Sequence, residues 1–136
     1  MTPKWIDTYQ ELGEALKRFK EMVDEPEDKN TYVIDATIQR FEFCIDLFWK
    51  CLKKICESEG VISNSPKQTL QEAFAMKLID DEQIWLNMMA DRNRTSHTYH
   101  QPLARSVFQS VKTYYPTMQS TYAALGKRYN VAAKKS

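Results

Sequence analysis

Apolar residues recur every three or four positions along most of this 136-residue chain, and this spacing constrains the fold more than any other feature. The spacing places apolar side chains on one face of an α-helix, whereas a strand would need strict alternation. The chain has only three glycines and five prolines, so few residues are suited to β-turns or phosphate-binding loops. The sequence therefore predicts an all-α protein.

Apolar stripes and helix start signals divide the chain into five helical segments. The first stripe covers residues 5–23 and the second covers residues 31–57, with an acidic, proline-containing link between them. Serine and proline at 65–66 begin a short helix that stops near Lys77, because serine is a good N-cap and proline suits the first helical position. A fourth helix begins at the acidic run 80–82 and leads into Arg92, and a fifth begins at 101–102. These segments predict an up-and-down four-helix bundle with one extra short helix.

The segment 31–57 has a wider apolar arc than the first helix. A wide arc predicts burial on two sides, either at the centre of the bundle or at the seam of a homodimer. We expect a single domain over residues 1–136 that forms a homodimer, with frayed ends at residues 1–4 and 127–136.

Charge and cysteine content exclude several classes of protein. A net charge of +1 gives no general attraction to nucleic acid, so any site for a polyanion must be local. Cys44, Cys51 and Cys56 lie on an apolar helical pattern without the paired spacing of a zinc site, which indicates reduced core thiols and a cytoplasmic protein. No apolar run approaches the roughly 20 residues that span a bilayer, and we expect no membrane contact, metal or cofactor.

The stretch from Arg92 to Tyr99 brings together residue types that suit phosphate chemistry. An arginine carries a permanent, forked charge for phosphate, and a histidine can move protons near neutral pH. RNA cleavage without a metal needs a base, an acid and a cation on the transition-state phosphate, and His97 and Arg92 suit these roles. On an unbroken helix their side chains would point roughly 140° apart. They converge only if the helix loosens between them or if a second copy supplies the partner.

Each of these residues also has an ordinary structural interpretation. An arginine at a helix end is often solvated or salt-bridged, which is also what we expect of Arg94 as a surface charge. A histidine near a helix C-terminus often complements the helix dipole, and this is the alternative for His97. Tyr99 can pack its ring against the end of the bundle.

Charged residues of the second helical segment give further candidates. Glu42 and Asp46 lie four positions apart and therefore share one face of a helix. They form either a solvated stripe or part of a cleft near Arg92, whose orientation they would fix. Arg40 and Asn93 complete the set of candidate cleft-lining residues.

The pattern Arg92-x4-His97-x-Tyr99 resembles the signature of HEPN domains that are paired with minimal nucleotidyltransferases. Other segments resemble the same family, namely Gln-Arg-Phe-Glu-Phe at 39–43, Ser-Pro at 65–66, Glu-Ala-Phe at 72–74, Leu-Ile-Asp-Asp at 78–81 and Trp85. The resemblance covers most of the chain, from about residue 5 to residue 122, and the subgroup it looks most like is that of the nucleotidyltransferase substrate-binding proteins.

The resemblance implies a helical bundle that dimerises so that both motifs face a shared cleft, and a separate minimal nucleotidyltransferase as partner. In members that act as toxins it implies RNA cleavage by the residues matching Arg92 and His97. It further implies that the partner, in the role of antitoxin, silences the toxin by adenylylating the residue that matches Tyr99. Our leading hypothesis is a metal-independent endoribonuclease of this toxin type. The alternatives are a non-catalytic subunit that binds a nucleotide or other substrate for the partner, and a plain dimerisation module.

Overall fold

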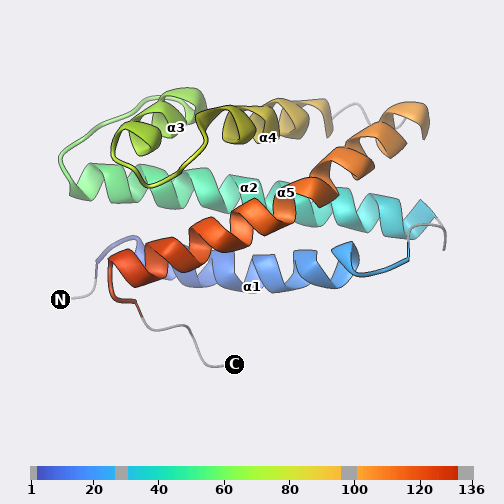
Figure 1. Ribbon diagram of the computed structural model, residues 1–136, viewed down its shortest axis with the longest axis horizontal. Coiled ribbons are helices and arrows are strands. Elements are labelled where there is room, and N and C mark those ends of the chain that lie inside the picture. The colour runs from blue at the N-terminus through green and yellow to red at the C-terminus, as the bar shows by residue number, and fades with distance from the viewer. Residues whose placement is uncertain (1–2, 27–30, 96–100, 132–136) are drawn as a thin grey trace.

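The computed structural model describes residues 3–26, 31–95 and 101–131. These ranges contain five helices and no strand, and the helices are α1 (Ile6–Val23), α2 (Thr31–Ser58), α3 (Pro66–Ala75), α4 (Glu82–Arg94) and α5 (Gln101–Arg128). In Figure 1, α3 and α4 follow one side of α2 and α1 follows the other. Helix α5 crosses in front of α2, from the end of α4 to the start of α1. The all-α prediction, with four longer helices and a short one, is confirmed.

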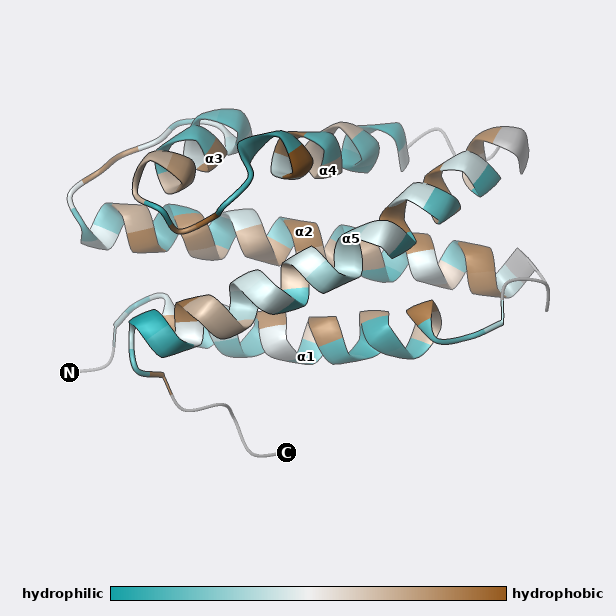
Figure 2. Ribbon diagram, in the orientation of Figure 1, coloured by the Kyte–Doolittle hydropathy of each residue, from teal (hydrophilic) through white to brown (hydrophobic). Residues whose placement is uncertain are grey.

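Helix α2 is the centre of the bundle, because it packs against each of the other four helices. Its fully buried apolar side chains are Phe41, Cys44, Ile45, Phe48, Cys51, Leu52, Ile55 and Cys56. Figure 2 shows apolar residues, in brown, at several points along α2, which contacts all four other helices. The wide apolar arc is thus accounted for within one chain, although Phe43 on the same helix is 54% exposed.

Local signals fix the starts of α3 and α4 as the sequence indicates. The Ser65 hydroxyl accepts a hydrogen bond from the backbone N–H of Gln68 at 3.1 Å. The Asp81 carboxylate accepts one from the backbone N–H of Ile84 at 3.2 Å. Both side chains satisfy N–H groups that the first helical turn leaves without partners. Helix α3 ends before Lys77, which has a left-handed φ of 61°.

An aromatic seam joins the start of α1 to the end of α5. We define this seam as Tyr9, Tyr122, Gly13 and Gly126. The two tyrosine rings stack with centroids 4.2 Å apart, and the Tyr9 hydroxyl donates to the backbone carbonyl of Tyr122 at 2.8 Å. A Cβ on Gly126 would collide with the Tyr9 hydroxyl, and a Cβ on Gly13 would collide with that of Tyr122. The two helices can therefore approach only because both positions lack a side chain.

The three cysteines are buried and unpaired, as predicted for core thiols. Burial raises the pKa of both Cys44 and Cys51 to about 12, which keeps them protonated near neutral pH. Among the helices over the described residues, none is long and apolar enough to cross a membrane.

Candidate functional site

Arg92 lies in the last turn of α4, and its side chain extends toward α2. The inner face of α4 is anchored by Trp85 and Met88, both fully buried. The Trp85 ring packs edge-on against Phe48 of α2 at 4.7 Å between centroids. Since residues three and four apart share a helix face, the same face carries Arg92 to the surface of α2 one turn later.

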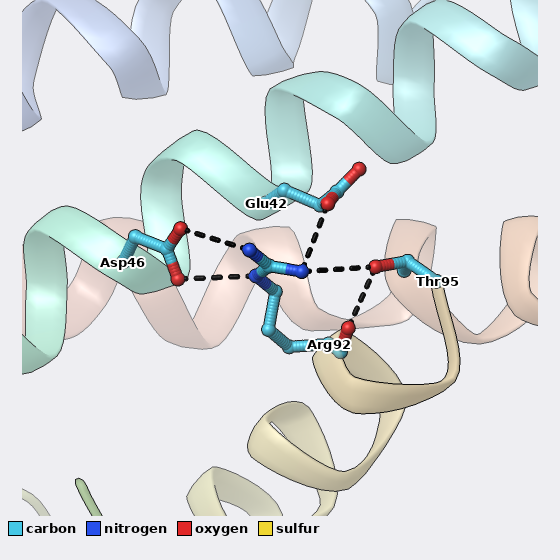
Figure 3. A network of polar contacts seen from close by, with 4 residues as sticks. All are labelled: Glu42, Asp46, Arg92 and Thr95. Carbon is cyan, nitrogen blue, oxygen red and sulfur yellow. Dashed lines mark hydrogen bonds and ion pairs between the residues drawn. The ribbon is translucent and has the colours of Figure 1, made fainter. Parts of the chain in front are cut away.

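Four residues form the Arg92 cluster, which we define as Arg92, Glu42, Asp46 and Thr95 (Figure 3). The guanidinium binds Asp46 through two atoms, with Nε 3.1 Å from Oδ1 and Nη2 3.3 Å from Oδ2. Its Nη1 lies 2.9 Å from Oε2 of Glu42 and 3.2 Å from the Thr95 hydroxyl oxygen. The Thr95 hydroxyl donates to the backbone carbonyl of Arg92 at 2.6 Å. Thr95 therefore contacts both the backbone and the guanidinium of Arg92.

The Arg92 cluster combines a fixed cation with access to solvent. The side chains of Arg92, Glu42 and Asp46 are 30%, 27% and 35% exposed. The hydrogen bond to Asp46, together with attraction to both carboxylates, raises the pKa of Arg92 against the opposing effect of burial. One guanidinium and two carboxylates carry a formal net charge of −1, so the cluster is not an open cationic patch.

The structure brings some of the candidate residues together and separates others. Glu42 and Asp46 contact Arg92, as expected if they fix its orientation. Asn93 follows Arg92 in α4 and is exposed. Arg40 lies elsewhere, because it donates to the backbone carbonyl of Arg18 on α1 at 2.9 Å and pairs with Glu21 there. Two residues along a helix turn a side chain by roughly 200°, which places Arg40 and Glu42 on different faces.

His97 and Tyr99 lie outside the described residues. The segment that carries them follows Thr95, the C-cap of α4, and precedes α5. The Arg92 cluster therefore stands immediately before this part of the chain.

Asp91 is a further polar residue at the end of α4, outside the set of candidates predicted from the sequence. Asp91 is 7% exposed, and its carboxylate accepts hydrogen bonds from the Tyr114 hydroxyl at 2.6 Å and from Arg94 at 2.9 Å. Burial, followed by the bond to Asp91, raises the pKa of Tyr114. Arg94 is thus paired as well as partly exposed. An acidic residue three positions after Met88 on the apolar stripe was the available signal.

Metal binding has no structural support in the described ranges. They contain no group of three or more histidine, cysteine, aspartate or glutamate side chains placed to hold a metal ion. The chemistry that the Arg92 cluster can offer is that of a held guanidinium beside two carboxylates.

The five-helix bundle, whose α4 carries Arg92 in its last turn, has the fold of a HEPN toxin of known structure. The chain belongs to the family described as "Nucleotidyltransferase substrate binding protein like", whose profile matches residues 7–127.

Three known proteins are similar to this chain in sequence or in fold. The chain is 32% identical over 84 residues to a protein of Haemophilus influenzae named "Probable ribonuclease HepT", and the match spans 58% of each protein. A crystal structure of a Thermus thermophilus protein shares 36% identity with a TM-score of 0.77, and covers 84% of this chain and 98% of its own. A "tri-AMPylated Shewanella oneidensis HEPN toxin in complex with MNT antitoxin" has the same fold at 14% identity, with a TM-score of 0.76 and coverage of 93% and 99%.

Proposed function

We propose that this protein is a metal-independent endoribonuclease of the HEPN toxin type. The observation that carries the proposal is the placement of Arg92, whose guanidinium is held by α2 and Thr95 yet remains partly open to solvent. A permanent, preoriented cation is suited to the charge that develops on a phosphate during cleavage. The similarity to the Haemophilus influenzae protein supports the same activity.

In the proposed reaction, the 2′-oxygen attacks the adjacent phosphorus while a base removes its proton. The bond to the 5′-oxygen breaks, and that oxygen takes a proton as it leaves. Arg92 stabilises the negative charge on the phosphate, and His97 moves the protons. Two copies of His97, one from each protomer of a homodimer, would provide a base and an acid.

We further propose a minimal nucleotidyltransferase as partner and Tyr99 as the residue that it adenylylates. The Shewanella oneidensis structure, whose name includes an AMPylated toxin and an MNT antitoxin, supports this regulation. A nucleotide on Tyr99 would place an anion two residues from His97 and close in sequence to Arg92. With the partner nucleotidyltransferase, ATP and Mg²⁺, the adduct is expected on Tyr99 and should be absent in Tyr99→Phe when mapped by mass spectrometry.

The alternative function is a non-catalytic subunit that binds a nucleotide or other substrate for the nucleotidyltransferase. Two observations favour it: the name of the matched family, and the formal charge of −1 on the Arg92 cluster. In this case the Arg92 cluster would recognise one nucleotide and would not bind a long RNA.

Cleavage of RNA by the purified protein in the presence of a chelator tests the proposed function. Arg92→Ala and His97→Ala should each reduce the rate by about 100-fold or more, as removal of one transition-state contact usually does. Arg40→Ala is the matched control, because it removes an arginine that also pairs with a carboxylate but lies against α1. Absence of cleavage by the unchanged protein, or normal cleavage by both variants, would leave the substrate-binding subunit as the function.

A further inference from the structure

We propose that the two carboxylates around Arg92 have different roles. Asp46 is a positioning residue that holds the guanidinium, whereas Glu42 occupies the edge where a substrate phosphate binds and is displaced by it. This inference rests on the proposed function in one respect, namely that Arg92 binds phosphate. Beyond that function, we infer that Glu42 competes with the substrate phosphate for the Arg92 guanidinium.

The geometry of the guanidinium distinguishes the two partners. A guanidinium offers a side edge, formed by Nε and one Nη, and an end edge, formed by both Nη atoms. Asp46 covers the side edge with one oxygen on Nε at 3.1 Å and the other on Nη2 at 3.3 Å. Glu42 contacts Nη1 alone, at 2.9 Å, and Figure 3 shows its carboxylate on the side of Nη1 that faces Nη2, which is the end edge.

A phosphate that binds through two N–H groups must use one of these edges. At the side edge it would have to remove both contacts with Asp46. At the end edge the phosphate would replace a single contact with Glu42 and leave both contacts with Asp46 in place. Displacement of Glu42 is therefore the smaller change, and it keeps the orientation of Arg92 for the incoming phosphate.

The surroundings of Glu42 permit this exchange. Its side chain is 27% exposed and starts one helical turn before Asp46 on α2, so the carboxylate can rotate into water without leaving a buried charge. Thr95 also contacts Nη1, at 3.2 Å, and it remains as a neutral partner when Glu42 leaves. Until that exchange, two carboxylates repel an approaching phosphate and keep its affinity low.

Binding of a short single-stranded oligonucleotide with 2′-deoxyribose, which cannot be cleaved by this route, tests the inference by fluorescence anisotropy. Glu42→Gln keeps the shape and a hydrogen-bond acceptor but removes the negative charge. It should lower Kd roughly three- to ten-fold, and the gain should shrink at high salt. Glu21→Gln is the matched control, because Glu21 pairs with Arg40 at 3.3 Å on another face, and its Kd should stay unchanged.

Asp46 is tested by its effect on the orientation of Arg92. Asp46→Asn should weaken oligonucleotide binding and lower kcat for RNA more than it raises KM, while Asp46→Glu restores part of kcat. A merely structural role would instead lower the unfolding midpoint without this division between kcat and KM.

The outcomes separate this inference from the proposed function. If Glu42→Gln binds no more tightly than Glu21→Gln, or if neither protein binds, displacement of Glu42 is overturned even where RNA cleavage still needs Arg92. If the gain persists after Arg92→Ala is added, the gain does not come from this guanidinium and the inference also fails. If Glu42→Gln tightens binding through Arg92 but no RNA is cut, the inference stands and the nucleotide-binding function replaces the ribonuclease.

Discussion

The aromatic seam and the Arg92 cluster join helices in opposite ways. In the seam, α1 and α5 meet through stacked rings and two glycines, and Tyr9 donates a hydrogen bond to the backbone carbonyl of Tyr122. In the cluster, α4 meets α2 through one arginine and two carboxylates that remain partly exposed. In Figure 1 the start of α1 and the end of α5 lie at one end of the bundle, and α4 ends toward the other.

This difference indicates that the aromatic seam stabilises the fold, whereas the side chains of the Arg92 cluster can exchange their contacts for contacts with a substrate. Close apolar packing loses stability with any added volume, because the interior has no free space. Partly exposed ion pairs contribute little to stability, since water competes for each charge. We therefore expect substitutions in the seam to affect folding and substitutions in the cluster to affect substrate.

The largest expected effect is the loss of RNA cleavage in Arg92→Lys. Lysine keeps the positive charge but has no fork with which to bind Asp46 and a phosphate together. The rate should fall about 100-fold, as when an oriented donor is removed from a transition state. Single-turnover cleavage measures this rate. A variant that cuts within a factor of about two of the unchanged protein would show that charge alone suffices and that the geometry of the cluster is not used.

The next effect is the destabilisation expected for Gly126→Ala. In a helix this change normally stabilises by about 1 kcal/mol, because glycine is a poor helix former. Here the new methyl group meets the Tyr9 hydroxyl, so the free energy of unfolding should instead fall by about 1–3 kcal/mol. Ser120→Ala, at an exposed position of α5, is the control for the helix itself. If denaturant unfolding shows Gly126→Ala to be more stable than the unchanged protein, the close packing of the seam does not stabilise the fold.

A smaller effect is a loss of stability at alkaline pH, which depends on the buried tyrosines Tyr9 and Tyr114 and not on the Arg92 cluster. Burial raises the pKa of Tyr9 and of Tyr114 above the ordinary value for tyrosine. The folded protein thus keeps protons that the unfolded chain releases. The stability from these neutral hydroxyls is complete below about pH 10 and is lost as the pH rises further, by up to about 1.4 kcal/mol per pH unit for each tyrosine.

Unfolding measured at several alkaline pH values should show a shallower loss in Tyr9→Phe than in the unchanged protein. The raised pKa of Arg92 keeps the cluster charged through this range. Equal slopes for the two proteins would contradict the burial of Tyr9 as the cause.

The sequence predicted the features that depend on neighbouring residues. Caps at Ser65 and Asp81 mark the starts of α3 and α4, because each side chain bonds an N–H three residues away. The wide apolar arc predicted burial of α2 on two sides, and the centre of the bundle was one of two positions that this left open. The pairing of Glu42 and Asp46 with Arg92 was one of two open interpretations, since a shared helix face does not reveal what it meets.

Contacts between segments that are distant in the sequence could not be predicted from the spacing of residues within one helix. Gly126 was expected beside a frayed end, yet α5 continues through it to Arg128, and its role comes from Tyr9, more than 100 residues earlier. Asp91 has no local cue for its partner Tyr114, which α5 supplies. Arg40 was placed with the cleft because it lies near Glu42 in sequence, although the turn of the helix directs it to α1. Each difference arises from packing between helices, which spacing within one helix does not encode.

The most direct test of the central claim compares Arg92→Ala with Gly126→Ala in one set of measurements, namely the free energy of unfolding by denaturant and RNA cleavage in a chelator. We expect Arg92→Ala to unfold within about 1 kcal/mol of the unchanged protein and to lose cleavage. Gly126→Ala should be less stable but should still cut RNA below its unfolding transition. An Arg92→Ala protein that is destabilised as much as Gly126→Ala, or that retains full cleavage, would contradict the separation of fold and function.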